Sequence, residues 1–313
     1  MFLAAFGKHP GWDDHIEDLG LETERLIGMK RLLYVEGISG NVDSGAWAKL
    51  SETQRLEGFD HLFVSRKASD VVVGRMWSSS DGKGRTRYPM VVCAQCSSLP
   101  LSWVLQQVLP RLEHAKNRCV STTSASAVRS VIDDTRRGLR ELAQHIEASP
   151  EGLGMPEGTL AALADRPEMG KNYEGLLRIL YRIEEWISAN DGGGSDTTTR
   201  VVPGSFYIRV PACADSPADT IVLWLRFLLG EFDRSDSVIL LLPLAESWID
   251  IIVGEPTVKE FYCILASLEA IPRTTDIPYT LAPDFIDRVG RRIAASSLRG
   301  KATFPASSDS PPR

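Results

Sequence analysis

Short apolar runs rich in β-branched residues, separated by polar turns, dominate the first hundred residues. Residues 70–77 (DVVVGRMW) and 88–94 (YPMVVCA) favour strands, because such side chains fit a pleated, half-buried surface. Residues 61–66 (HLFVSR) precede them, and the opening FLAAFGK favours another short strand. The connections are too short for crossover helices, so the pattern predicts an antiparallel meander.

Apolar positions at helical spacing predict helices on both sides of this meander. Residues 21–35 place Leu26 and Leu33 on one face, with Glu22 and Glu24 in the first turn, where the helix dipole favours carboxylates. A shorter helix is expected at 46–56. Residues 101–117 predict a helix that Pro110 must kink or restart. Ser124 or Ser126 then caps a long amphipathic helix to residue 148.

The second half of the chain repeats this mixture of elements without any residue-level repeat. Helices are expected at 159–164 and 173–189, followed by a strand at 206–210 and an apolar helix at 220–232. Residues 238–243 and 248–253 favour a hairpin, and 258–270 and 285–295 favour two further helices.

These elements predict an α/β protein of the α+β type, in which antiparallel sheets pack with helices and two αβ units are joined by a helical region. The expected boundaries are 1–118 for the N-terminal αβ domain and 201–296 for the C-terminal one. Residues 119–200 form the helical region and end in a linker, ANDGGGSDTTT at 189–199. The composition of 297–313 predicts a disordered tail.

Composition and charge narrow the function classes. The 313 residues are 43% hydrophobic with a formal net charge of −6, which argues against nucleic acid as a partner. No apolar run approaches the length of about 18–20 residues that spans a bilayer, so membrane insertion is not expected. The N-terminus lacks a basic region before its few apolar residues, and the five cysteines are an odd number. Both features predict a cytoplasmic protein.

The pair Cys93 and Cys96 forms a CxxC motif without a second pair to complete a zinc ribbon. On a strand, residues three apart point to opposite faces, so this pair would diverge rather than chelate. All five cysteines are therefore expected to be small buried hydrophobic residues, and no cofactor is predicted.

A polar stretch, SSSDGKGRTR, links the strands at 70–77 and 88–94, and it is the most distinctive loop in the chain. It carries Asp81, Lys83, Arg85 and Arg87, and we call its residues 79–87 the basic loop. A phosphate-binding loop would open a helix, whereas this segment leads into a strand. The remaining interpretations are a solvated turn and a loop that contacts proteins or anions.

The turn after the first strand, HPGWDDH, holds the only cluster of side chains able to bind a metal. His9, Asp13 and His15 could hold a divalent ion and lower the pKa of bound water, which gives a metal-dependent hydrolase as the alternative function. The simpler interpretation is a turn in which Asp13 or Asp14 caps the next segment. There is no GxSxG nucleophile motif.

Two stretches carry a family resemblance. FGKHPGWDD at 6–14 resembles the GKxPxxxDF opening of the TagF family, accessory proteins of type VI secretion systems. SSDGKGRTRYPMVV at 79–92 resembles the DxxGRxFPL segment of the same family. The matching positions are Gly7, Lys8, Pro10 and Asp13 or Asp14 in the first stretch, and Asp81, Gly84 or Arg85, Tyr88 and Pro89 in the second. His15 stands where the family has phenylalanine, which makes this a divergent match covering about the first 100 residues.

This resemblance implies a cytoplasmic regulator without catalytic activity, which acts after translation on the secretion apparatus through protein–protein contacts. The implied partners are proteins of the apparatus, including a forkhead-associated scaffold protein. Opposite charges on the first turn and the basic loop could bring the two together and fix the loop for a partner. The predicted interface residues are Lys8, Asp13, Asp14, Asp81, Lys83, Arg85 and Arg87.

Overall fold

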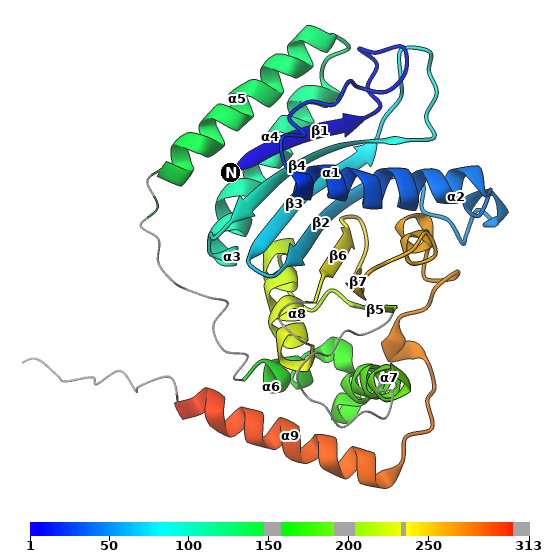
Figure 1. The fold of residues 1–313 in the computed structure, drawn as a ribbon. Helices are drawn as coiled ribbons and strands as arrows, with labels where there is room; N and C mark the ends of the chain where they lie inside the picture. The colour runs from blue at the N-terminus through cyan, green and yellow to red at the C-terminus, as the bar shows by residue number, and fades with distance from the viewer. Residues whose placement is uncertain (145, 147–157, 191–203, 233–235, 303–313) are drawn as a thin grey trace, which may run out of the picture.

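A single antiparallel sheet organises the molecule. The computed structural model describes residues 1–144, 146, 158–190, 204–232 and 236–302. Within them a seven-stranded sheet has the order β1-β4-β3-β2-β6-β7-β5 (Figure 1). The strands are β1 (Phe2–Gly7), β2 (Asp60–Lys67), β3 (Asp70–Ser78), β4 (Pro89–Ser97), β5 (Ser205–Pro211), β6 (Val238–Pro243) and β7 (Trp248–Gly254).

The expected meander is present as β2, β3 and β4, and the hairpin of the second half is present as β6 and β7. These two groups are joined, because β2 pairs with β6 from His61↔Pro243 to Arg66↔Val238. The α+β class with antiparallel strands is thereby confirmed. The strands of the two predicted αβ units belong to one continuous sheet.

One face of the sheet is covered by a long helical segment from the first half of the chain. It begins as α1 (Glu24–Met29), where the Thr23 side chain accepts a hydrogen bond from the Leu26 amide, at 3.2 Å. It continues as a π-helix, η1 (Lys30–Ser39), and ends as α2 (Gly40–Asp43). The predicted helix at 21–35 therefore starts later and runs further. The helix expected at 46–56 is reduced to a 3₁₀ turn, η2 (Trp47–Lys49).

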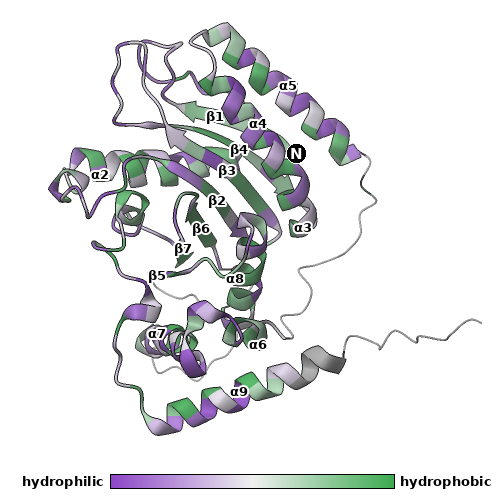
Figure 2. Cartoon of the chain, turned by 180° about the vertical axis from the view of Figure 1, so that it is seen from behind, coloured by the Kyte–Doolittle hydropathy of each residue, from purple (hydrophilic) through white to green (hydrophobic). Residues whose placement is uncertain are grey.

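The opposite face carries most of the other helices. Alternating green and purple along α5 in Figure 2 shows the amphipathic pattern expected for a helix with one packed side. Pro110 lies at the start of α4, where the hydrogen bonding of a continuous helical backbone changes from π to α, so its missing amide falls in the first turn of the α-helical segment. These helices are α3 (Leu101–Trp103) with η3 (Val104–Val108), α4 (Leu109–Val120), α5 (Ala125–Gln144), α6 (Thr159–Ala164), η4 (Pro167–Met169), η5 (Lys171–Tyr173), α7 (Glu174–Asn190), α8 (Pro217–Glu231) and α9 (Pro283–Ala302).

Strand residues alternate between two hydrophobic cores, one on each face. Phe63 belongs to the core beneath η1, whereas its neighbour Leu62 belongs to the core beneath α4 and α8. Cys93 and Cys96 lie in different cores, which confirms that they point to opposite faces. All five cysteines are buried and free, and burial raises the pKa of the Cys93 thiol to about 12.

The prediction of a helix at 258–270 is wrong. Only a 3₁₀ segment, η6 (Glu260–Leu265), forms there, and a second one, η7 (Thr274–Asp276), follows. The reason is the buried side chain of Arg209, whose guanidinium donates to the carbonyls of Cys263, Ala266, Ser267 and Ile271 at 3.0–3.1 Å. In a helix over 258–270 the carbonyls of Cys263 and Ala266 would accept from amides four residues later, and both face Arg209 instead. Arg209 also forms a bidentate pair with Asp250, directly opposite on β7.

The predicted linker and the predicted C-terminal tail lie partly outside the described residues. The linker at 189–199 lies outside them from residue 191 onward, and so do residues 303–313. The helix α9 continues past Ser297 to Ala302, so the segment expected to be a disordered tail begins as helix. Among the helices described, none is both long enough and apolar enough to cross a membrane.

Candidate functional site: a charged cluster between the first turn and the basic loop

The first turn and the basic loop leave the sheet at the same place. β1 and β4 pair antiparallel, with Gly7 opposite Met90, and the Lys8 amide donates to the Pro89 carbonyl at 3.0 Å. Gly7 has a φ of +106°, and a Cβ there would lie 2.2 Å from the Pro89 oxygen. Only glycine allows this approach, which sets the turn directly against the loop.

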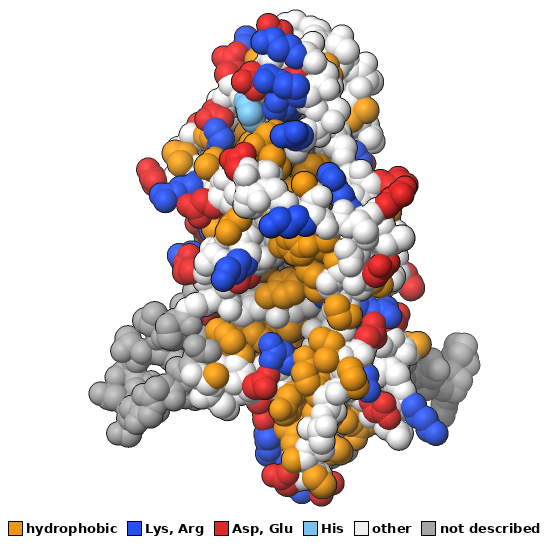
Figure 3. All heavy atoms as spheres, turned by 90° about the vertical axis from the view of Figure 1, so that its right-hand side faces the viewer, with side chains coloured by type: hydrophobic (Ala, Val, Ile, Leu, Met, Phe, Trp, Pro, Cys, Tyr) orange, Lys and Arg blue, Asp and Glu red, His pale blue; other side chains and the backbone are white. Residues whose placement is uncertain are grey.

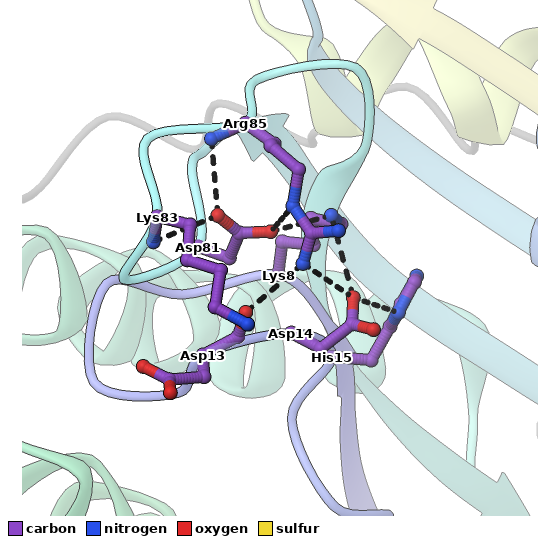
Figure 4. A network of polar contacts seen from close by, with 7 residues as sticks. All are labelled: Lys8, Asp13, Asp14, His15, Asp81, Lys83 and Arg85. Carbon is purple, nitrogen blue, oxygen red and sulfur yellow. Dashed lines mark hydrogen bonds and ion pairs between the residues drawn. The ribbon is translucent and has the colours of Figure 1, made fainter.

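Asp81 lies at the centre of the cluster and is almost fully buried, with 2% of its surface exposed. Its Oδ2 accepts from Lys8 Nζ at 2.6 Å and from Arg85 Nε at 2.7 Å. Its Oδ1 accepts from the backbone amides of Lys83 and Arg85, both at 3.0 Å. Four donors therefore satisfy one buried carboxylate, and Asp81 fixes both the shape of the basic loop and its place against the turn (Figure 4).

The electrostatics of Asp81 follow from these contacts. Burial alone would raise the pKa of its carboxyl group. The hydrogen bonds from Lys8, Arg85 and the Lys83 amide outweigh burial and hold that pKa well below its usual range. Asp81 is consequently a carboxylate at neutral pH, and the Lys8 ammonium beside it, also buried, is paired.

Arg85 connects the loop to the turn a second time. Its Nη2 donates to the Asp13 carbonyl at 2.9 Å and lies 3.2 Å from Asp14 Oδ1. The Gly82 amide donates to the Trp12 carbonyl at 2.7 Å. Partial desolvation opposes ionisation of Asp14, but Arg85, His15 and Lys8 outweigh it and lower its pKa. The loop is thus held by backbone and side-chain contacts together.

Three aromatic rings, those of His15, Tyr34 and Tyr88, pack together beside the charged cluster. The ring of His15 lies edge-on to Tyr88 at 5.4 Å and to Tyr34 at 5.8 Å, measured between centroids. Lys8 Nζ lies 5.5 Å from the centre of the Tyr88 ring. Tyr34 comes from η1, and its buried hydroxyl has no hydrogen-bond partner among the described residues. Burial, with Tyr88 and Asp14 nearby, raises the pKa of Tyr34 far above its ordinary value.

Six of the seven predicted interface residues take part in the contacts between the turn and the loop, and Arg87 does not. Lys8, Asp14, Asp81 and Arg85 interact through their side chains, whereas Asp13 contributes its carbonyl and Lys83 its amide. Arg87 and the Lys83 side chain are exposed, and no described residue forms an ion pair or hydrogen bond with either one. Lys and Arg side chains, with acidic ones among them, gather at the upper end of the face shown in Figure 3. The loop therefore presents two unpaired cations to solvent.

The histidines of the first turn do not form a metal site. His9 is buried, its Nδ1 accepts from the Gly11 amide at 3.0 Å, and its Nε2 consequently donates to the Cys119 carbonyl at 2.9 Å. Burial lowers the pKa of His9 and favours this neutral form. His15 lies instead beside Asp14, at 3.0 Å. Among the described residues, no group of three His, Cys, Asp or Glu side chains is placed to hold a metal ion.

Sequence reasoning missed the aromatic partners of the cluster. Tyr34 lies next to Leu33 on the face that helical spacing predicts to be buried, but nothing in the spacing connects it with Tyr88 or His15. Trp12 was also missed: its ring packs edge-on against His9 at 5.7 Å and under Arg129 at 5.8 Å, between centroid and Cζ. The Pro-Gly-Trp sequence marked a turn but not these contacts.

Comparison with known proteins gives little further guidance. No family model matches the chain, and no curated protein matches it. Among solved structures, the crystal structure of PA0076 from Pseudomonas aeruginosa PAO1 is similar at 11% sequence identity with a TM-score of 0.40. The match covers 90% of this chain and 98% of that one.

Proposed function

We propose that this protein is a non-enzymatic cytoplasmic regulator of a type VI secretion apparatus, acting after translation through protein–protein contacts. The observation that carries the proposal is the meeting of the two stretches that resemble the TagF family. Lys8 of the first stretch and Asp81 of the second form a buried ion pair at 2.6 Å. Residues from the two stretches that carry the resemblance are in contact here, and they hold the surface loop in place.

The form of the loop suits binding rather than catalysis. The charged groups that interact strongly, Lys8 and Asp81, are buried and paired with each other, so they are not available to a substrate. The groups left for a ligand are the exposed cations Lys83 and Arg87 on a loop fixed in advance. Preorganisation lowers the entropy lost on association, and charged rims set partner choice and association rate.

The charges also indicate the chemistry of the partner. The chain as a whole carries a net charge of −6, so an acidic partner gains no attraction from the overall charge and depends on local cations. Lys83 and Arg87 supply two such cations on the basic loop. We propose that the partner, a component of the apparatus such as a forkhead-associated scaffold protein, presents carboxylates to this loop.

An affinity capture from native lysate tests the proposal. The variant Lys83→Glu/Arg87→Glu reverses both exposed cations without touching the buried pair. The matched control Lys49→Glu/Lys259→Glu makes the same charge change at exposed lysines elsewhere. We expect the wild type and the control to retain proteins of the secretion apparatus and the loop variant to lose them. Equal retention by all three forms, or retention of no apparatus protein, would overturn the proposal.

A further inference from the structure

An open cleft of about 700 Å³ lies at the end of the sheet where β2 begins and β3 and β6 end. One wall is the segment 53–61, and the other is the turn between β6 and β7 together with Ser267. Its volume falls within the range of about 300–1,000 Å³ typical of small-molecule sites. The cleft is separate from the charged cluster, and neither Lys8 nor the basic loop lines it.

Hydrogen bonds between the two halves of the chain fix the walls of the cleft. The Leu56 amide donates to the Leu265 carbonyl at 2.9 Å, and the Ser267 amide donates to the Gln54 carbonyl at 2.8 Å. At the inner end, the Leu244 amide donates to the Asp60 carbonyl at 2.9 Å. The cleft is therefore formed before any ligand arrives, which favours binding.

Several charged side chains that line the cleft form no ion pair with one another. Asp60 is satisfied, because Arg75 Nη2 lies 2.7 Å and Lys116 Nζ lies 3.2 Å from its Oδ1. Glu57, Glu246 and Arg55 differ from it, since no described residue forms an ion pair or hydrogen bond with any of their side chains. Two carboxylates and one guanidinium, on the exposed Glu57 and Arg55 and the half-buried Glu246, thus line one cleft and are open to a ligand.

Glu246 is the most informative of the three. It is partly buried, and burial raises the pKa of its carboxyl group against the opposing effect of Arg209. Arg209 attracts this half-buried carboxylate without pairing with it, because its guanidinium is already bonded to Asp250 and to backbone carbonyls. A cation placed beside Glu246 would offset the remaining cost of its partial desolvation. The cleft is therefore short of positive charge at Glu246.

The rest of the lining agrees with a cationic ligand that has an apolar stem. His61 is fully buried, and desolvation lowers its pKa to about 4, so this side chain adds no positive charge at neutral pH. Leu56, Phe59 and Pro243 supply apolar surface between the charged groups. Aliphatic carbons of a ligand can pack there while its charged end reaches Glu246.

We infer that this cleft binds an organic cation with an aliphatic stem, of the class that includes arginine, lysine and aliphatic diamines. Glu246 and Glu57 hold the guanidinium or ammonium group, and Arg55 binds the carboxylate of a ligand that has one. The same chemistry is offered by a free amino acid and by a basic side chain of another protein. The inference does not depend on the proposed regulatory function.

Isothermal titration calorimetry on the full chain, supported by thermal shift, tests this inference. The probes are L-arginine, L-lysine, 1,4-diaminobutane and N-acetyl-arginine amide, with L-glutamate as the negative control. We expect the cationic probes to bind and to raise the melting temperature further as their concentration increases, with the logarithmic dependence of a ligand that binds the folded state. Equal affinity of L-arginine and the amide would identify a protein side chain as the source, and a clear preference for L-arginine would identify the free amino acid.

Variants separate a specific site from general charge attraction. Glu246→Gln should weaken binding about 10- to 100-fold, as the loss of a charged hydrogen bond predicts. Glu52→Gln, an equal charge change at an exposed residue outside the cleft, should leave the affinity unchanged. Circular dichroism checks that both variants are folded, and Glu57→Gln provides a second test. Absence of binding by every cationic probe at millimolar concentration, or equal binding by wild type and Glu246→Gln, would overturn the inference.

Discussion

Lys8 and Asp81 lie 73 positions apart in the chain and form a buried ion pair with 2.6 Å between Nζ and Oδ2. Each side chain makes the burial of the other possible, because either charge alone would lack a sufficient partner. The position of the basic loop therefore depends on a residue of the first turn, and the predictions below begin with this dependence.

A double-mutant cycle should measure the coupling of this pair. Lys8→Met leaves the Asp81 carboxylate with one cation fewer, and Asp81→Asn leaves the buried ammonium with the more distant Asp14 carboxylate, at 3.5 Å, as its ionic partner. We expect each single variant to lower the melting temperature by several degrees, and the double variant to lose clearly less than the sum. Differential scanning calorimetry checks this. Lys49→Met, at an exposed lysine, is the control, and strictly additive losses would contradict the expected coupling.

The pH dependence of stability should show the ionised state of Asp81. Its pKa is lower in the folded state than in the unfolded chain, where an aspartate has a pKa of about 3.9. The folded protein then binds fewer protons below about pH 5, so the contribution of Asp81 is present at neutral pH and is lost as the pH falls. Urea midpoints between pH 7 and pH 3 should fall less steeply for Asp81→Asn than for the wild type. Parallel curves would show that Asp81 is not the responsible group.

Gly7→Ala should separate the turn from the loop. The new Cβ meets the Pro89 carbonyl at 2.2 Å and the residue has a φ of +106°. Gly45→Ala is a matched control, because Gly45 has a φ of +66° but no atom within 4 Å of the added Cβ. The control should lose about 1–2 kcal/mol of unfolding free energy from backbone strain alone, and Gly7→Ala should lose more. Equal losses in denaturant titrations would show that the close approach to Pro89 is unimportant.

The buried pair Arg209 and Asp250 should matter most for the second half of the sheet. Arg209→Met leaves a buried carboxylate and several buried carbonyls without their donor, and we expect a loss of about 3–5 kcal/mol. Arg288→Met removes an exposed pair with Glu184 and should lose less than about 1 kcal/mol. Arg209→Lys should not restore stability, because an ammonium cannot reproduce the bidentate pairing. Chemical denaturation measures all three, and rescue by lysine would contradict this account.

Because β2 pairs with β6, we expect the first half of the chain to aggregate when it is produced without the second half. A fragment of residues 1–144 would expose the edge of β2 from His61 to Arg66, which β6 covers in the whole chain. Unprotected edges pair with other chains, so the fragment should aggregate. Size-exclusion chromatography of this fragment beside residues 1–302 checks the expectation. A monomeric fragment with a sharp thermal transition would instead support an independent domain at 1–118.

Helices and strands that depend on nearby residues in the chain could be predicted from the sequence. Strands β2, β3 and β4 follow from β-branched runs and short connections, and the change of helical hydrogen bonding near Pro110 follows from its missing amide. The contact between first turn and basic loop was expected from their opposite charges, although its role as an interface stays a prediction.

Long-range pairing explains what could not be predicted. Nothing near His61 or Pro243 signals that β2 and β6 are neighbours, because that choice is made among all available strand edges. The helix expected at 258–270 does not form, and two carbonyls it would use, those of Cys263 and Ala266, bond to Arg209, a residue more than fifty positions earlier. The aromatic contacts of the charged cluster could not be predicted for the same reason. Tyr34 contacts Tyr88 because η1 packs on the sheet, and that packing is a long-range contact.

Burial gives the two lysines of the charged cluster different chemical reactivity. Lys8 Nζ is enclosed and held as a paired ammonium, so acylating reagents, which need an accessible neutral amine, should leave it unmodified. Lys83 is exposed on the same loop and should react readily. An amine-reactive cross-linker would therefore attach a bound partner at Lys83 without disturbing the ion pair that holds the loop in place.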